Sequence, residues 1–194
     1  ARFPLVLRVP AWAEGATVRV AGAAEEPMKA GTLHRIERAW QGEVQVRVRF
    51  PMRPAVVRGY NELVAVERGP LVYSLQIGEE WTRVNADKPH RELPHADFEV
   101  RPTTAWNYGL ILDEQHPERS LRFEERPVGE RPFSPEGAGM AASAKGRKLP
   151  SWKLQRGWAA EISPADVAWT NRPPATPEPA EDITLVPYGC TNIR

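Results

Sequence analysis

The feature that most constrains this chain is a series of short runs in which apolar and polar residues alternate. The clearest run extends from Glu43 to Phe50, where Val44, Val46 and Val48 share one face with Phe50. A period of two is the pattern of a β-strand with one buried and one solvated face. The 20 prolines shorten helices and confine strands to brief runs. The sequence therefore predicts an all-β chain of antiparallel strands with little helix.

Other runs of the same kind recur along the chain, separated by turn residues such as Gly69-Pro70. In the first 76 residues they follow one another at intervals of about 8–15 residues, a spacing typical of β-sandwiches. The predicted strands besides 43–50 are 3–9, 17–20, 32–37, 62–66 and 71–76, with weaker ones at 106–112, 120–123, 140–144, 152–154 and 183–186.

A change in composition near Gly78 suggests a domain boundary. From Gly78 to Pro102 the chain is polar and rich in charge and proline, so helix is expected there only in brief turns and strand character returns at Trp106. We expect two antiparallel β-sandwich (jelly-roll-like) domains in tandem. The first is residues 1–77, short of its N-terminal strands, and the second is the Pro-rich segment 78–194, with loops at 125–139 and 171–181.

The ends of the sequence are abrupt. A strand pattern begins at Phe3 without a lead-in, and the last residues, Asn192 to Arg194, have the character of a strand that continues. We therefore expect a segment of a longer protein.

Charge and hydropathy limit the partners. The net charge is +1, so the chain has no broad field for nucleic acid or an anionic membrane surface. No stretch approaches the roughly 18 apolar residues of a membrane-spanning helix. We expect neither nucleic acid nor membrane as a partner. The compartment stays open between the bacterial cytoplasm and the periplasm or secretion.

The residues that carry chemistry form no convincing constellation. Cys190 is the one cysteine, which rules out an intrachain disulfide and a multi-cysteine zinc site, and we interpret it as a small buried residue. Glu67, Asp113 and Glu114 are interpreted as strand-end and loop residues. No catalytic residue, no metal ligand and no cofactor is predicted in this chain. The histidines are scattered: His34, His90, His95 and His116.

Seven tryptophans provide the candidates for binding. An exposed indole face stacks on the CH groups of a sugar, whereas most tryptophans of small sandwiches pack in a core or at a seam. Trp106 is predicted in the core, and Trp12 and Trp40 are predicted to pack. The candidates for carbohydrate contact lie in less regular segments: Trp81, Trp158 and Trp169.

Four phrases stand out along the chain: LRVPAWA at 7–13, RIERAW at 35–40, VAVERGPLVY at 64–73 and LVPYGCTNIR at 185–194. Taken in this order, they resemble the C-terminal region of glycoside hydrolase family 127, the β-L-arabinofuranosidase-like proteins. A fifth phrase, WNYGL at 106–110, is also similar. Each phrase alone is moderately specific, and their order along the chain is the stronger signal.

The resemblance implies an (α/α)6 catalytic barrel followed by two β-sandwich domains. It also implies a zinc site of a glutamate and cysteines in that barrel, none of which can be carried onto this chain. The expected function is a non-catalytic C-terminal accessory or scaffold module of a glycoside hydrolase that acts on L-arabinofuranosides or related plant glycans. Its expected partners are the helical barrel of the same protein and, in a homodimer contact, a second copy. The alternative is a carbohydrate-binding module with an exposed aromatic platform.

Overall fold

The computed structural model describes residues 1–59, 63–155, 158–159 and 176–193. In this part of the chain strands dominate, every strand pair with a defined register is antiparallel, and the helical segments are single 3-10 turns, η2 (Pro117–Arg119) and η3 (Tyr188–Cys190). The predicted all-β antiparallel class is confirmed. The chain forms two compact units, residues 1–54 with 68–70 and residues 55–67 with 71–194. The tandem sandwiches with a boundary after residue 77 stay a prediction.

The first unit consists of two antiparallel sheets. One pairs two strands and the other has three in the order β3-β2-β5. The predicted strands 3–9, 17–20 and 32–37 correspond to β1, β2 and β4, whereas β3 was not predicted. The strands are β1 (Arg2–Arg8), β2 (Thr17–Val20), β3 (Glu25–Pro27), β4 (Leu33–Ala39) and β5 (Val46–Arg49).

Both sheets of this unit contribute to one core. Leu7 and Ile36 from the two-stranded sheet pack with Val18 and Val48 from the three-stranded sheet, around residues such as Val9 that are almost fully buried. Burial alternates from Val44 to Phe50 as the sequence predicts, although regular pairing covers only Val46–Arg49. The alternation therefore located the buried face correctly and overestimated the length of the strand.

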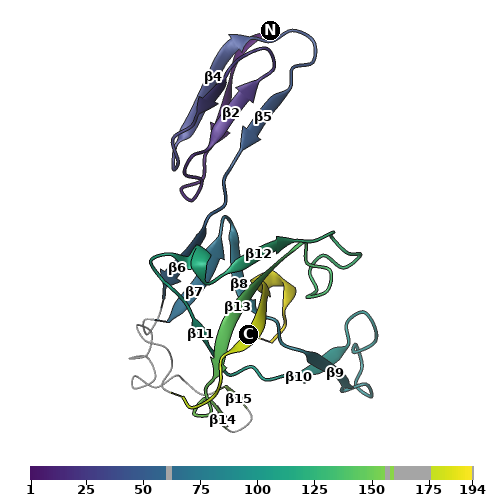
Figure 1. The fold of residues 1–194 in the computed structure, drawn as a ribbon. Coiled ribbons are helices and arrows are strands. Elements are labelled where there is room, and N and C mark those ends of the chain that lie inside the picture. The colour runs from purple at the N-terminus through teal and green to yellow at the C-terminus, as the bar shows by residue number, and fades with distance from the viewer. Residues whose placement is uncertain (60–62, 156–157, 160–175, 194) are drawn as a thin grey trace. The chain divides into compact units, whose positions relative to one another are not determined.

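The second unit is built on a curled seven-stranded sheet (Figure 1). The order is β11-β13-β16-β8-β7-β6, and β12 pairs with the same edge of β13 as β11 does. Strand β6 was not predicted, and β13 is longer than expected. The strands are β6 (Pro54–Arg58), β7 (Val64–Arg68), β8 (Leu71–Leu75), β11 (Tyr108–Ile111), β12 (Arg122–Glu125), β13 (Met140–Lys148) and β16 (Glu181–Pro187).

The strands of this sheet supply most of the core of the second unit. Leu185 of β16 lies opposite Leu75 of β8 and Ala142 of β13, and the buried cluster also includes Val66 and Tyr73. Small residues along β13 let neighbouring side chains approach closely. Strand β16 thus supplies the centre of the packing, and its pairing fixes the C-terminal segment against β8 and β13.

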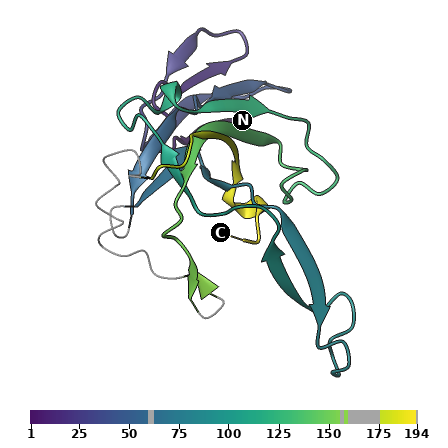
Figure 2. The same cartoon turned by 60° about the horizontal axis from the view of Figure 1, so that its bottom comes forward.

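A separate two-stranded hairpin corrects the sequence interpretation of 78–102. Strands β9 (Glu79–Val84) and β10 (Asp97–Pro102) pair antiparallel and project from the curled sheet (Figures 1 and 2). No strand was predicted there because most of the side chains on both faces are exposed, which removes the contrast between an apolar and a polar face. A further short hairpin consists of β14 (Leu154–Gln155) and β15 (Trp158–Ala159).

Candidate functional site

The best candidate site is a cavity in the second unit, with a volume of about 630 Å³. It lies where β8 passes into β9 and is bounded by β16, by the start of β11 and by the turn at 131–136. Its size is in the range of small-molecule sites, about 300–1,000 Å³. The residues that define its chemistry are Gln76, Glu79, Trp81, Thr104, Tyr108, Arg131, Phe133, Ser134, Glu136, Asp182, Thr184 and Asn192.

Trp81 is the predicted carbohydrate candidate that this cavity contains. It sits in β9 opposite Val100 of β10, and 50% of it is exposed. Its ring meets Phe98 edge-on at a centroid distance of 5.7 Å. Its indole N–H donates to Glu79 Oε2 at 3.1 Å, two residues earlier on the same side of the strand. The edge-on contact with Phe98 and the hydrogen bond to Glu79 therefore fix the ring, and half of its surface faces solvent.

Glu79 fastens the start of the hairpin to the C-terminal segment. Its carboxylate accepts hydrogen bonds from the backbone N–H of Asn192 at 2.8 Å, from the Asn192 side-chain amide at 2.9 Å and from the N–H of Ile193 at 3.3 Å. Burial alone would raise the pKa of Glu79, but the hydrogen bonds from Asn192, Trp81 and Ile193 together hold the pKa below its ordinary value of 4.5. Glu79 is therefore an ionised anchor that orients Trp81.

This anchor predicts a pH dependence of stability. A carboxylate whose folded pKa is lowered stabilises the fold above its unfolded pKa, and the benefit disappears as the pH falls through the folded value. We expect Glu79→Gln to lower the urea midpoint at pH 7, and the difference from wild type to shrink below about pH 4.5. The control is Glu80→Gln, an exposed neighbour in the same strand. A difference independent of pH would contradict this role.

Phe133 lines the cavity from the turn at 131–136 and is 81% exposed. The turn is closed by the N–H of Ser134 donating to the Arg131 carbonyl at 3.0 Å and by the N–H of Gly137 donating to Ser134 Oγ at 3.1 Å. The segment 125–139 was predicted as a loop, and beyond Glu125 this is confirmed. The turn places an aromatic ring where no core can cover it.

A polar triad lies beside the cavity at Tyr108. The Tyr108 hydroxyl donates to Glu181 Oε2 at 2.6 Å, and Lys148 Nζ donates to Glu181 Oε1 at 2.9 Å. Burial and the Glu181 carboxylate raise the pKa of Tyr108, and the same carboxylate raises the pKa of Lys148. The hydrogen bonds from Tyr108 and Lys148 lower the pKa of Glu181. The triad is therefore a structural contact in which a neutral Tyr108 on β11 and a charged Lys148 on β13 both donate to an ionised Glu181 on β16.

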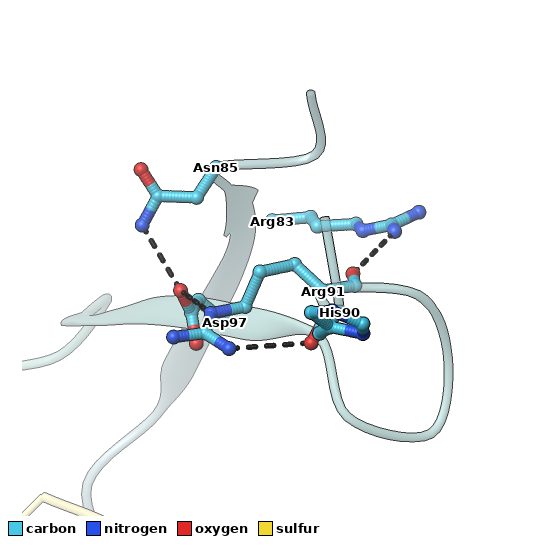
Figure 3. Close-up of polar contacts among 5 residues, drawn as sticks. All are labelled: Arg83, Asn85, His90, Arg91 and Asp97. Carbon is cyan, nitrogen blue, oxygen red and sulfur yellow. Dashed lines mark hydrogen bonds and ion pairs between the residues drawn. The ribbon is translucent and has the colours of Figure 1, made fainter. Parts of the chain in front are cut away.

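The far end of the β9–β10 hairpin is closed by a second polar cluster (Figure 3). Asp97 Oδ2 accepts from Asn85 Nδ2 at 3.0 Å and from Arg91 Nε at 2.8 Å, and Arg83 donates to the Arg91 carbonyl at 2.8 Å. The hydrogen bond from Asn85, and then Arg91, lower the pKa of Asp97. Asn85 and His90 have positive φ, as expected in a tight connection. The cluster shapes the loop and orients no group for chemistry.

Two of the other acids considered from sequence, Asp113 and Glu114, also have structural partners. Asp113 accepts the backbone N–H of His116 at 2.9 Å, which is the leading cause of its lowered pKa. Glu114 forms an ion pair with Arg58 at 2.6 Å. Glu67 lies in β7. Asp113 therefore stabilises a turn, Glu114 forms an ion pair, and Glu67 is a strand residue.

Cys190 is buried in a small apolar cluster, as predicted, and its Sγ lies 3.5 Å from the Pro132 carbonyl oxygen. Burial raises the pKa of its thiol, so it is poorly suited to be a thiolate ligand. Among the described residues, no group of three or more His, Cys, Asp and Glu side chains is placed to hold a metal ion. The zinc site that the family resemblance implies does not fit these residues.

The remaining tryptophan predictions have different outcomes. Trp12 packs against the core of the first unit and Trp40 stacks on Phe3 at 5.6 Å, so both are packing residues as predicted. Trp106 is half-buried and precedes β11 rather than lying within a strand. Trp158 lies in β15, where its side chain is outside the described part, and Trp169 lies outside the described residues altogether.

Sequence reasoning missed most of the cavity. Phe133, Asp182 and Asn192 lie far from Trp81 along the chain, and only the sheet brings them together. One signal was present: Phe133 is an aromatic residue in a Pro- and Gly-rich loop, where no strand periodicity gives it a core face. In the described chain, no helix is both long and apolar enough to cross a membrane.

Comparison with known proteins gives one family-model match, over residues 1–52, and several structures of similar fold. Residues 1–52 match the sequence model of the GH127 middle domain, β-L-arabinofuranosidase. No curated protein matches the chain. A GH127 β-L-arabinofuranosidase from Geobacillus stearothermophilus T6 superposes with a TM-score of 0.52 at 22% identity, covering 98% of this chain and 24% of that chain. The GH127 β-arabinofuranosidase BT3674 gives 0.55 at 19% identity, covering 100% and 26%.

The chain thus spans about a quarter of the length of these solved structures, 24% and 26%. At this level of identity the structural likeness speaks for the fold. The family model that residues 1–52 match describes a middle domain, and the predicted C-terminal placement stays a prediction. The first 52 residues are therefore similar to the GH127 middle domain, and the chain shares its fold with part of two GH127 enzymes.

Proposed function

We propose that this chain is a non-catalytic accessory module of a glycoside hydrolase that acts on L-arabinofuranosides or related plant glycans. The observation that carries the proposal is the match of residues 1–52 to the GH127 middle domain. The shared fold with segments of two enzymes named as β-arabinofuranosidases supports it.

The acids with a shifted pKa act as structural anchors. A glycoside hydrolase commonly uses a pair of carboxyl groups, one of them an acid with a raised pKa. Every Asp and Glu in the described chain with a resolved shift has a lowered pKa: Glu79, Asp97, Asp113 and Glu181. Such groups stay ionised and hold structure, and they are poor proton donors near neutral pH.

In this proposal the module packs against the helical catalytic barrel of the same protein, and the zinc that the family resemblance implies belongs to that barrel. Exposed apolar side chains on β1 and β4, namely Phe3, Val6 and Leu33, supply surface for such a contact or for a homodimer. The carbohydrate-binding alternative has one observation in its favour: Trp81 is half-exposed in a cavity of ligand size.

The test compares two products of the same reading frame. One is residues 1–194, and the other is the longest in-frame product that contains them. We expect 4-nitrophenyl β-L-arabinofuranoside to be hydrolysed by the longer product and not by residues 1–194. Hydrolysis by residues 1–194 alone would contradict a non-catalytic role, and a reading frame without a catalytic domain would contradict the accessory role.

A further inference from the structure

The cavity beside Trp81 has two exposed aromatic side chains from different elements. Trp81 reaches it from β9, and Phe133 from the turn at 131–136. Both rings are substantially accessible, Trp81 at 50% and Phe133 at 81%. Aromatic side chains provide large apolar surfaces at little conformational cost, and such rings are largely buried on average in folded proteins.

The hydrogen bonding of the indole N–H decides which interaction Trp81 can offer to a ligand. Its N–H is already donated to Glu79 Oε2 at 3.1 Å, and Glu79 is itself held by Asn192. The ring therefore has no hydrogen-bond donor left for a ligand. The interaction that Trp81 can still offer is stacking of its accessible ring face on CH groups. The hydrogen bonds through Glu79 fix the orientation of the ring before a ligand binds. Preorganisation of this kind lowers the entropic cost of binding.

Around these rings lie polar groups with unused hydrogen-bonding capacity. Thr104 and Ser134 each accept one backbone N–H, from Gly78 at 2.9 Å and from Gly137 at 3.1 Å, so both hydroxyl protons are free to be donated. The side chains of Gln76, Thr184, Arg131 and Glu136 have no hydrogen-bond or ion-pair partner within the described chain. The lining thus combines hydrogen-bond donors and acceptors with apolar aromatic faces, the two kinds of contact that a sugar offers.

The charges of the lining select against anionic ligands. Glu79, Glu136 and Asp182 contribute carboxylates, and Arg131 is the one cation among the lining residues. Lys145 Nζ lies 2.7 Å from Asp182 Oδ1 and neutralises part of this negative charge. The balance is acidic, which disfavours phosphorylated, sulfated and carboxylated compounds but allows carboxylates to accept hydrogen bonds from neutral hydroxyl groups.

From these observations we infer that the cavity binds a neutral saccharide, with one sugar ring stacked on Trp81 and its hydroxyl groups toward the polar lining. The inference deepens the proposed function and rests on it only for the choice of an arabinofuranoside as the first probe. It assigns to the module a direct contact with glycan.

The experiment is a titration followed by the indole N–H signals of the seven tryptophans in 15N-labelled protein. The neutral probes are methyl α-L-arabinofuranoside and D-galactose, and the anionic probe is D-galacturonic acid, which differs from galactose by the carboxylate at C6. We expect the Trp81 signal to shift with a neutral sugar at millimolar concentration and not with galacturonate. Trp81→Ala removes the reporter, so binding by that variant is measured calorimetrically.

The variants locate the site. Trp81→Ala and Phe133→Ala should each weaken binding by about three- to tenfold, and Trp81→Phe should retain part of it. The matched control is Leu154→Ala, since Leu154 is similarly exposed at 52% but does not line the cavity. Dispersion of the remaining indole signals shows that each variant is folded.

The outcomes separate the two proposals. No binding of any neutral probe, equal binding of galacturonate, or unchanged binding by Trp81→Ala would each overturn the saccharide site. The accessory role would survive such a result if the longer product hydrolyses arabinofuranosides. Binding that is lost in Trp81→Ala, together with a reading frame that lacks a catalytic domain, would support the site and contradict the accessory role.

Discussion

Leu185→Ala should lower the free energy of unfolding of the second unit by about 2–5 kcal/mol. Leu185 is 2% exposed and belongs to the buried cluster of the curled sheet. It sits in β16 between Leu75 and Ala142 of the flanking strands, so the lost methyl groups leave a cavity that neither neighbouring strand can fill without breaking its pairing. Urea unfolding followed by the indole signal of Trp81 measures the effect.

The matched control is Val72→Ala in β8, where the side chain is 40% exposed and little apolar surface is lost. This variant should stay within about 0.5 kcal/mol of wild type. The signals of Trp12 and Trp40, which belong to the first unit, should not follow the shift caused by Leu185→Ala. A change below about 1 kcal/mol would mean that β16 is not the centre of the packing.

Gly137→Ala is expected to open the turn that carries Phe133, at a cost of about 1–3 kcal/mol. A Cβ atom at position 137 would overlap the carbonyl oxygen of Arg131 and lie 2.6 Å from its carbonyl carbon. Both atoms are backbone, so no side-chain rotation relieves the clash. Because the same carbonyl accepts the N–H of Ser134, the turn must change as a whole. Neutral-sugar binding should weaken with it.

The control for this change is Gly189→Ala, since a Cβ atom there meets nothing within 4 Å. Its stability and its sugar binding should match those of wild type. Thermal unfolding and the same titration measure both variants. If Gly137→Ala binds as wild type does while it is destabilised, the turn at 131–136 contributes to stability and not to the cavity.

The contrast between two strand segments shows what local pattern can predict. From Val44 to Phe50 one face is apolar and the other charged, and the structure buries the side that the sequence indicates. The β9–β10 hairpin has β-prone residues such as Trp81, Thr82 and Val100, but most of its side chains are exposed, so no face is apolar enough to reveal the period. Pairing across the hairpin, rather than burial, defines these strands.

The candidate site also has a part that the sequence could predict and a part that it could not. Trp81 was a candidate from sequence because an aromatic residue in a polar segment has no core to enter. Its partners were beyond such reasoning, because Glu79 and Asn192 are 113 residues apart and meet only through the pairing of β16 with β8. The predictions for Trp158 and Trp169 stay predictions.

Local sequence determined the all-β class, the buried face of the first unit and Trp81 as one of three candidates for an exposed tryptophan, because each depends on neighbours within a few residues. The tertiary structure alone decided the curled sheet, the projecting hairpin and the cavity. These depend on which distant strands pair, and that choice is made by the summed packing of Leu185, Val66 and their neighbours rather than by any local pattern.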